Sequence, residues 1–305
     1  MYKVFFITFG CKVNQYETDS MRSEFVSQGF VETDSADDAD IIIINSCTVT
    51  GSGDSKSLYS VRKMRKIAPN AIIALTGCLP QAAPETAAKI PEADIVAGTK
   101  DRRKLPELVR SVIAERRHIV AIDQYGAHDE FELTRFEGAQ DKTRAFVKIQ
   151  DGCNQFCSYC IIPYARGRLR SKPIDALKDE ISRLAQSGRR EIVLVGINLA
   201  FYGVEFGLRL ADAVEVCCKT EGIERVRLGS LEPEMLSDED LRRLAALPEL
   251  CPQFHLSLQS GSENTLKAMN RKYTAADYFT LTQKIRAAFP NASFTTDIMV
   301  GFPTE

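Results

Sequence analysis

The sequence predicts an α/β protein in which an N-terminal parallel sheet covered by helices is followed by a partial (β/α) barrel. Short runs that are apolar throughout recur along the chain, and such runs indicate strands buried on both faces. Segments with helical spacing separate these runs, as in parallel βα units. In the second half, five such repeats occur with no returning hairpin, which favours a barrel or partial barrel over an open sheet.

The composition fits a soluble two-domain protein. The chain has 305 residues, of which 44% are hydrophobic and 26% charged, enough for two domains with sizeable cores. The net charge of -2 excludes a strongly basic nucleic-acid binder but leaves room for local basic patches. No apolar run approaches the roughly 18 residues of a membrane helix, and no small-residue cleavage site follows the apolar start of the chain. We therefore expect a cytoplasmic protein without membrane contact.

The first domain is expected at residues 1–123, followed by a polar linker at 124–142 that lacks a clear period. Three segments have helical spacing, and Gly29 is suited to end the first of them. The predicted strands are Val4–Phe9, Ile41–Asn45, Ala71–Thr76, Asp94–Ala97 and Ile119–Ile122. The residues that mark the helices are Met21, Phe25 and Val26, then Leu58, Val61 and Met64, then Leu105, Leu108 and Val112.

The second domain is expected at residues 143–305. One helix runs from Ile174 to Leu184 and is closed by Gly188, and Ser237 with Asp240 three residues later resembles a capping box. The chain stops after its last apolar strand with no helix to cover it, so we expect a piece of a longer polypeptide. The predicted strands are Ala145–Ile149, Glu191–Val195, Arg225–Leu228, Phe254–Leu258 and Ser293–Val300.

Three cysteines form the sharpest local signal. The chain has nine cysteines, and an odd number in a cytoplasmic protein indicates metal binding or catalysis rather than disulfides. Cys153, Cys157 and Cys160 are spaced C-x₃-C-x₂-C directly after a strand. A [4Fe–4S] cluster normally takes four thiolates, so three would leave one iron open to the amino and carboxyl groups of S-adenosylmethionine (SAM). A structural zinc site, which usually pairs C-x₂-C units, or three unrelated thiols are the alternatives.

A second, dispersed triad follows the strands of the first domain. Cys11, Cys47 and Cys78 each come directly after a predicted strand, and binding sites of parallel sheets lie outside the carboxyl ends of the strands. Gly10 and Gly77 precede two of them and let the backbone approach a bulky ligand. A second cluster with three protein ligands is the simplest interpretation. The alternative is that these cysteines pack as small hydrophobic residues.

The remaining cysteines have the pattern of structural residues. Cys217 and Cys218 share a helical face with Leu210 and Val214, and Cys251 stands before a proline at a helix end. His255 lies in an alternating strand, where packing is the simpler role, although it could face a barrel interior.

Two motifs connect these triads to a known family. The C-x₃-C-x₂-C spacing, with Tyr159 before its last cysteine, resembles the motif of the radical SAM superfamily. The segment 10–18, together with Cys47 and Cys78, is similar to the N-terminal domain of the methylthiotransferases, and the resemblance covers the whole chain. It implies a Rossmann-like N-terminal domain and a truncated radical SAM partial (β/α) barrel. A small C-terminal RNA-binding β-domain of that family would lie beyond the end of this chain.

The residues after Cys11 indicate a subgroup. The run Cys11-Lys12-Val13-Asn14-Gln15-Tyr16-Glu17-Thr18 is similar to the methylthiotransferases that act on N6-threonylcarbamoyladenosine in tRNA. The subgroup acting on isopentenyladenosine tends to have Cys-Gln-Met-Asn at this place. The subgroup acting on an aspartate of a ribosomal protein tends to have Cys-Pro-Lys-Asn.

The resemblance implies a mechanism with two [4Fe–4S] clusters and two SAM-linked steps. The cluster at Cys153, Cys157 and Cys160 would cleave SAM to a 5′-deoxyadenosyl radical that takes the hydrogen from C2 of the modified adenine next to the anticodon. The cluster at Cys11, Cys47 and Cys78 would deliver sulfur already methylated by a second SAM. The cofactors would carry the difficult chemistry while the protein positions them.

The implied partners are the anticodon stem-loop of tRNA and an electron donor such as flavodoxin or ferredoxin, and we expect a monomer. Isopentenyladenosine in tRNA and the ribosomal-protein aspartate remain alternative substrates. A non-catalytic metal-binding RNA module is the alternative of a different class.

Residues at strand ends of the barrel are the candidates for SAM contacts. These are Tyr159, Gly196, Asn198, Ser230, Glu232, Gln259 and Ser260. A basic segment after the cysteine loop contains Arg166, Arg168, Arg170 and Lys172, which could hold tRNA phosphates or the SAM carboxylate. The family pattern favours a cofactor role for Arg166, whereas a solvated face fits Arg168 and Lys172 equally well.

Overall fold

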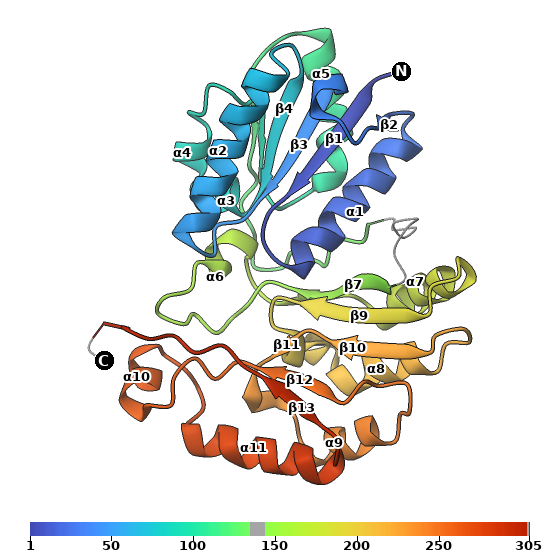
Figure 1. The fold of residues 1–305 in the computed structure, drawn as a ribbon, viewed down its shortest axis with the longest axis vertical. Coiled ribbons are helices and arrows are strands. Elements are labelled where there is room, and N and C mark those ends of the chain that lie inside the picture. Colours follow the sequence, from blue (N-terminus) through green and yellow to red (C-terminus); the bar gives the residue numbers. More distant parts are fainter. Residues whose placement is uncertain (135–143, 304) are drawn as a thin grey trace. The chain divides into compact units, whose positions relative to one another are not determined.

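The computed structural model describes residues 1–134, 144–303 and 305, apart from the side chain of Met235. Its internal contacts divide the chain into two compact units (Figure 1). Unit 1 consists of Met1–Glu137 and Ile161–Gly167, and unit 2 consists of Gly138–Cys160 and Arg168–Glu305. The boundaries 1–123, 124–142 and 143–305 stay predictions, and residues 135–142 of the proposed linker lie outside the described part.

Unit 1 is built on one parallel sheet, and all five predicted strands form within it. Its order is β2-β1-β3-β4-β5-β6, and each neighbouring pair among the described residues runs parallel. The edge strand β2 was not predicted, because it is only two exposed residues long. The bounds are β1 Lys3–Thr8, β2 Val31–Glu32, β3 Ile41–Ser46, β4 Ile72–Gly77, β5 Ile95–Ala97 and β6 Ile119–Ala121.

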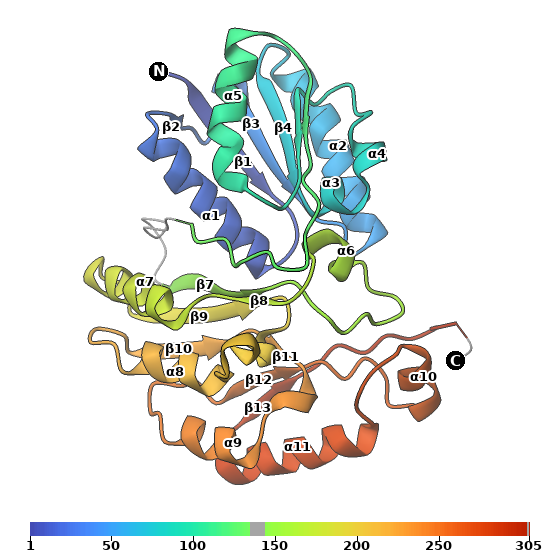
Figure 2. The same ribbon diagram turned by 180° about the vertical axis from the view of Figure 1, so that it is seen from behind.

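Helices cover both faces of this sheet, which confirms the expected layers. The run Ile41–Ile44 is fully buried, and its side chains alternate between the faces. Ile41 and Ile43 pack with α1 and α5, whereas Ile42 and Ile44 pack with α2 and α3 (Figure 2). The bounds are α1 Lys12–Ser27, α2 Gly51–Ile67, α3 Cys78–Ala82, α4 Pro84–Ala87, α5 Leu105–Ala114 and α6 Ile162–Arg166, with 3₁₀ turns at Ala36–Asp38 and Arg102–Lys104.

Unit 2 has the strand order of a partial barrel. The third predicted strand, Arg225–Leu228, forms with the same bounds as β10 and pairs with β9 in parallel. After Gly229 a short strand that was not predicted, β11, pairs with β12 in parallel. Along the chain, β7, β9 and β10 are thus followed by β11, β12 and β13, and among the described strands only the short β8 runs antiparallel. The bounds are β7 Arg144–Asp151, β8 Arg170–Ser171, β9 Glu191–Gly196, β10 Arg225–Leu228, β11 Ser230–Leu231, β12 Gln253–Leu256 and β13 Ser293–Thr295.

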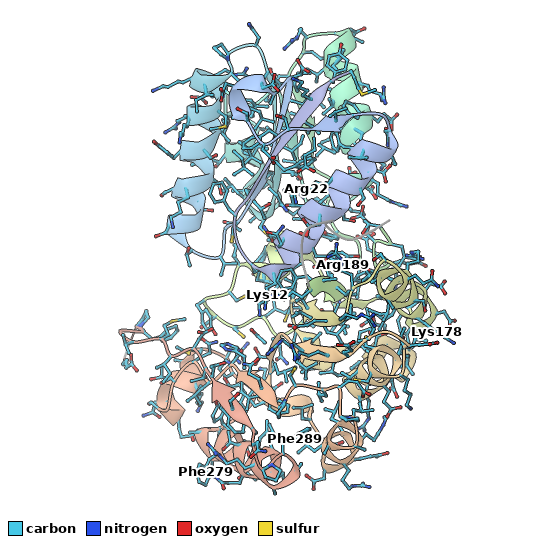
Figure 3. All side chains as sticks on the ribbon, turned by 45° about the vertical axis from the view of Figure 1, so that its right-hand side comes forward. Lys12, Arg22, Lys178, Arg189, Phe279 and Phe289 are labelled. Carbon is cyan, nitrogen blue, oxygen red and sulfur yellow. The ribbon has the colours of Figure 1, made fainter. Side chains whose placement is uncertain are left out.

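The helices of unit 2 pack along the outer side of its strands (Figure 2). Phe289, at the end of α11, packs on Phe254 of β12 with ring centroids 5.1 Å apart, whereas Phe279 on the same helix is exposed (Figure 3). Cys217 and Cys218 are buried in α8, as a structural role requires. The bounds are α7 Ile174–Gln186, α8 Leu210–Cys218, α9 Asp238–Ala245, α10 Glu263–Ala268 and α11 Ala275–Ala288, with 3₁₀ turns at Leu199–Phe201, Val204–Phe206 and Pro233–Met235.

Two predicted helix signals are confirmed at the level of hydrogen bonds. Ser237 accepts from the backbone N–H of Asp240 at 3.1 Å, and the Asp240 carboxylate accepts from the backbone N–H of Ser237 at 3.1 Å. This is the reciprocal arrangement of a capping box. Gly188 and Gly29 follow α7 and α1 with φ of 87° and 86°, the left-handed conformation in which helices commonly end.

A glycine is required where β4 meets α3. Gly77 has φ of 103°, and a Cβ atom at this position would lie 2.6 Å from both the Ser46 carbonyl oxygen and Asn45 Oδ1. No side chain fits there, and the backbone conformation is one that L-residues rarely adopt. The sharp turn lets Cys78 begin α3 directly after the strand.

Replacing Gly77 by alanine is therefore expected to destabilise the protein more than the same change at Gly29. Gly29 has a similar φ but nothing within 4 Å of its virtual Cβ, so Gly29→Ala should cost only the conformational penalty of about 1–2 kcal/mol. Gly77→Ala adds a steric clash between the new Cβ and the backbone of Ser46. We therefore expect it to lower the free energy of unfolding by clearly more than Gly29→Ala. Urea unfolding followed by circular dichroism measures both variants, and equal losses would contradict the close approach at Gly77.

Candidate functional site

The loop between β7 and α6 carries three cysteines. Gly152 and Phe156 have φ of 69° and 49°, left-handed conformations that fold the short loop back on itself. The backbone N–H of Cys160 donates to the carbonyl of Cys157 at 2.9 Å. Cys153, Cys157 and Cys160 are free thiols and partly buried, so one loop presents all three.

N–H groups point at two of these sulfur atoms. Cys153 Sγ accepts from the backbone N–H of Gln155 at 3.5 Å and from Asn198 Nδ2 at 3.7 Å, and Cys157 Sγ accepts from Arg271 Nη1 at 3.3 Å. Burial raises the pKa of the Cys153 thiol, while the bonds from Gln155 and Asn198 act in the opposite direction. Donors aimed at sulfur favour the thiolate, which is the form that binds metal.

The chemistry of this donor set fits an iron–sulfur cluster better than a single ion. Among residues 1–134, 144–303 and 305, no three His, Cys, Asp or Glu side chains are arranged to hold one metal ion. A zinc site would need its sulfurs about 2.3 Å from a common centre, whereas the thiolates of a [4Fe–4S] cluster bind different irons. Hydrogen bonds to the sulfurs are also a common feature of such clusters.

The predicted SAM contacts lie along the carboxyl side of the unit 2 strands. Asn198 follows β9, is buried, and reaches Cys153. Glu232 follows β11 and pairs with Arg271, which in turn bonds to Cys157. Tyr159 is 38% exposed with its ring centroid 6.1 Å from that of Phe302, and burial raises the pKa of its phenol to about 12.

The other predicted contacts have different surroundings. Gly196 ends β9, where a Cβ would lie 3.0 Å from Gln150 Cβ. Ser230 is exposed in β11. Gln259 has φ of 67°, and its backbone N–H donates to the carbonyl of Asp297 at 2.9 Å. Of the predicted contacts, Asn198 is therefore bonded directly to the cysteine loop, and Glu232 is connected to it through Arg271.

Two residues of this region have no counterpart in the sequence-based prediction. Gln150 is fully buried; its Nε2 donates to the carbonyls of Asp151 and Gly152, and its Oε1 accepts from the backbone N–H of Asn198 at 2.6 Å. It therefore joins the cysteine loop to the turn after β9. Gln150 could have been found from the sequence, because it is a polar residue at the end of an apolar strand. Arg271 could not, because it lies more than 100 residues from the cysteine loop.

The second triad stands at the ends of three adjacent strands of unit 1, since β1, β3 and β4 are neighbours in the sheet. Cys47 and Cys78 are buried and Cys11 is exposed. A Cβ atom on Gly10 would lie 2.9 Å from Cys47 Cβ and 3.1 Å from its Sγ. The turn before Cys11 thus rests directly on Cys47, which only a glycine permits. This close approach is consistent with Cys11 and Cys47 binding the same bulky group.

Asn14 joins the strand ends that carry this triad. Its Nδ2 donates to the carbonyls of Phe9 at 2.8 Å and Ser46 at 2.9 Å, one at the end of β1 and the other at the end of β3. Its own carbonyl accepts from Asn45 Nδ2 at 3.0 Å. One buried amide in the first turn of α1 therefore fixes the spacing of the Cys11 and Cys47 backbones.

A buried charge network lies in the same unit. Arg166 of α6 donates to both carboxylate oxygens of Glu17, at 2.6 and 2.9 Å, and to Asn14 Oδ1 at 2.8 Å. Arg102 approaches Glu17 at 3.1 Å, and all three charged side chains are at most 5% exposed. Burial is the main cause of the raised pKa of the Cys78 thiol; Arg166 and Arg102 act to lower this pKa, and Glu17 acts to raise it. The two arginines therefore oppose part of the effect of burial on Cys78.

These contacts correct the interpretation of the basic segment. Arg170 is buried and lies 3.4 Å from Asp151, and Lys172 is buried in an ion pair with Glu180. Of the four residues only Arg168 is exposed, so a solvated face fits Arg168 but not Lys172. Arg166 is bonded to Glu17 and Asn14 in unit 1, and its cofactor role stays a prediction.

Comparison with known proteins agrees with the two-part architecture. Residues 3–98 match the family described as Uncharacterized protein family UPF0004, and residues 147–305 match the Radical SAM superfamily. The fold is similar to the radical SAM methyltransferase TsrM from Kitasatospora setae, with a TM-score of 0.71 at 14% identity, covering 100% of this chain and 69% of that one. The fold class predicted from the sequence is confirmed.

Relatives at higher identity define the family. The threonylcarbamoyladenosine tRNA methylthiotransferase MtaB of Aquifex aeolicus is 37% identical over 99% of this chain and 74% of its own length. The MtaB of Chlamydia pneumoniae is 39% identical over 98% and 68%. A tRNA-2-methylthio-N(6)-dimethylallyladenosine synthase of Clostridium novyi is 38% identical over 99% and 69%. The chain belongs to the radical SAM methylthiotransferases, enzymes that use SAM and a [4Fe–4S] cluster. Within that family it is similar to MtaB.

Removal of the buried carboxylate is expected to destabilise unit 1 strongly. Glu17→Gln leaves Arg166 and Arg102 buried without a counter-charge, which should cost about 3–5 kcal/mol. Asp38→Asn is the matched control. Asp38 forms an ion pair with Lys3 at the surface, where the two side chains are 55% and 44% exposed. Exposed ion pairs contribute at most about 1 kcal/mol to the free energy of unfolding. Urea unfolding of both variants checks the difference. A Glu17→Gln loss no larger than that of the control would show that the network is not structurally important.

Proposed function

We propose that this chain is the catalytic part of a tRNA methylthiotransferase that modifies C2 of N6-threonylcarbamoyladenosine next to the anticodon. The observation that carries the proposal is the pair of cysteine triads, each at the carboxyl ends of parallel strands in its own unit. Two sites with different surroundings suit two tasks, one for SAM cleavage and one for sulfur.

The choice of nucleoside rests on the residues after Cys11. Relatives named for threonylcarbamoyladenosine and for dimethylallyladenosine have nearly equal identity to this chain, at 37–39% and 35–38%. Overall similarity therefore does not separate the two substrates. Lys12 and Val13 match the threonylcarbamoyladenosine subgroup rather than the Gln-Met pair of the other, and this supports the first substrate.

In unit 2 we assign Cys153, Cys157 and Cys160 to hold one [4Fe–4S] cluster. When bound, that cluster supplies the electron that cleaves SAM. Asn198 and Gln155 orient the Cys153 sulfur, and Gln150 keeps the turn after β9 against the cysteine loop. Asn198, Glu232 and Tyr159 remain the SAM contacts best placed by their proximity to this loop, while Gly196, Ser230 and Gln259 complete the proposed set.

In unit 1 we assign Cys11, Cys47 and Cys78 to hold the second cluster, the proposed source of the methylated sulfur in the second SAM-linked step. Asn14 holds the strand ends that present Cys11 and Cys47. Arg166 and Arg102 supply positive charge that opposes part of the effect of burial on the Cys78 thiol.

The proposal includes partners. The anticodon stem-loop of tRNA is the substrate, and a flavodoxin- or ferredoxin-like protein supplies electrons to a monomeric enzyme. Since tRNA is the substrate, we place the reaction in the cytoplasm. Among the described residues, none of the helices has both the length and the apolar character that crossing a membrane would require.

Nucleoside mass spectrometry of tRNA tests the substrate. Cells lacking the gene are expected to accumulate N6-threonylcarbamoyladenosine and to lose its 2-methylthio derivative, with full recovery on re-expression. Loss of the methylthio group from isopentenyladenosine instead would favour that alternative substrate. A methylthio mass gain on a ribosomal protein, with tRNA unchanged, would reject tRNA as the substrate.

Cysteine variants test the division of labour between the triads. Cys11→Ala is expected to abolish methylthiolation while SAM cleavage to 5′-deoxyadenosine continues, because the unit 2 ligands are intact. Cys157→Ala should abolish both. Cys217→Ala is a matched control for loss of a thiol, since Cys217 is buried in α8 of unit 2 and belongs to neither triad. A colourless wild-type protein that binds zinc and does not cleave SAM would instead indicate a non-catalytic RNA module.

A further inference from the structure

The turn after α10, residues 268–270, is hydrogen-bonded to the middle of the cysteine loop; we call this set of bonds the clamp. The backbone N–H of Ser158 donates to the carbonyl of Met269 at 3.0 Å, and the Ser158 hydroxyl donates to the carbonyl of Ala268 at 2.9 Å. Asn270 Nδ2 donates to the carbonyl of Phe156 at 2.9 Å. These bonds flank Cys157 on both sides and join segments more than 100 residues apart in the chain.

Arg271 extends this clamp to the sulfur itself. Its Nη1 donates to Cys157 Sγ at 3.3 Å, its Nη2 forms an ion pair with Glu232, and its Nε donates to the Tyr273 hydroxyl at 3.0 Å. The Arg271 side chain is only 5% exposed. Because three partners fix the planar guanidinium, its orientation toward Cys157 is set before any ligand binds.

The bond to Cys157 differs in kind from the other three. The bonds of Met269, Ala268 and Asn270 reach backbone or hydroxyl groups and place the loop. The bond of Arg271 reaches a proposed cluster ligand, and hydrogen bonds to such sulfurs are one of the means by which a protein sets the reduction potential of the cluster. The adjacent Glu232 carboxylate neutralises the guanidinium, so the influence is mainly that of a directed, charge-assisted donor.

We propose that Arg271 is a positioning residue that tunes the SAM-cleaving cluster by donating to Cys157, while Asn270 holds the loop in place. The inference rests on the proposed assignment of Cys153, Cys157 and Cys160 as cluster ligands. A donor to sulfur stabilises the reduced, more negative cluster, so its loss should make reduction harder.

The test uses the full chain with Cys11, Cys47 and Cys78 changed to alanine, so that a single cluster remains. After anaerobic reconstitution, iron content and a redox titration followed by electron paramagnetic resonance are measured without SAM. Arg271→Met combined with Glu232→Gln removes the donor without leaving a buried carboxylate unpaired. We expect full iron content and a reduction equilibrium about tenfold less favourable, or about 59 mV lower for a one-electron couple.

Two further variants separate tuning from placement. Arg271→Lys keeps the charge but not the planar fork, so we expect a smaller shift in the same direction. Asn270→Gly keeps the left-handed backbone, where Asn270 has φ of 59°. It removes the bond to Phe156 and one exposed bond, from Lys272 Nζ to Asn270 Oδ1 at 2.7 Å. We expect it to lose iron to a chelator faster at an unchanged potential.

The outcomes are distinct. If both Arg271 variants bind iron fully and have the potential of the parent protein, the proposed role of Arg271 is wrong. If Asn270→Gly lowers the potential as much as the Arg271 variants do, general loosening of the loop explains the effect and the proposal also fails. If the parent protein binds no [4Fe–4S] cluster, the failure lies in the proposed function.

Discussion

Parallel strand pairing is the constraint on which both proposed sites depend. In a parallel sheet all carboxyl ends lie at one edge, so residues far apart in sequence meet there without any contact specific to them. β1, β3 and β4 are neighbours in unit 1 and present Cys11, Cys47 and Cys78. In unit 2 the same geometry places the cysteine loop after β7 beside the turn after β9, where Asn198 reaches Cys153.

The two triads are supported by different physical means. Around Cys78 the support is long-range charge, because Arg166 and Arg102 lie buried with a single carboxylate between them. Around Cys153 and Cys157 the support is directional, since N–H groups of Gln155, Asn198 and Arg271 point at the sulfurs. This contrast agrees with the separate tasks that we propose for the two triads.

Sequence patterns predicted the layers, all the longer strands and the fold class, because burial imposes its period directly on the chain. They missed what depends on tertiary contacts. Nothing local marks Arg271 as a neighbour of Cys157, and nothing distinguishes the buried Lys172 from the exposed Arg168. The bond of Arg166 to Glu17 was missed for the same reason, since the two residues lie 149 positions apart. The strand β11 was also missed, because two residues after Gly229 are too few to form a recognisable pattern.

The first turn of α1 is largely buried, and this affects how the residues after Cys11 should be interpreted as a marker of the substrate. Asn14 is 1% exposed and holds the ends of β1 and β3, and the same residue type stands at this place in all three subgroup signatures. It therefore records the architecture that all of them share. Val13 is buried as well, at 3%, and Lys12 is exposed at the start of the helix (Figure 3). Of these three positions only Lys12 is exposed, so Val13 and Asn14 in this signature reflect how the helix packs against the sheet.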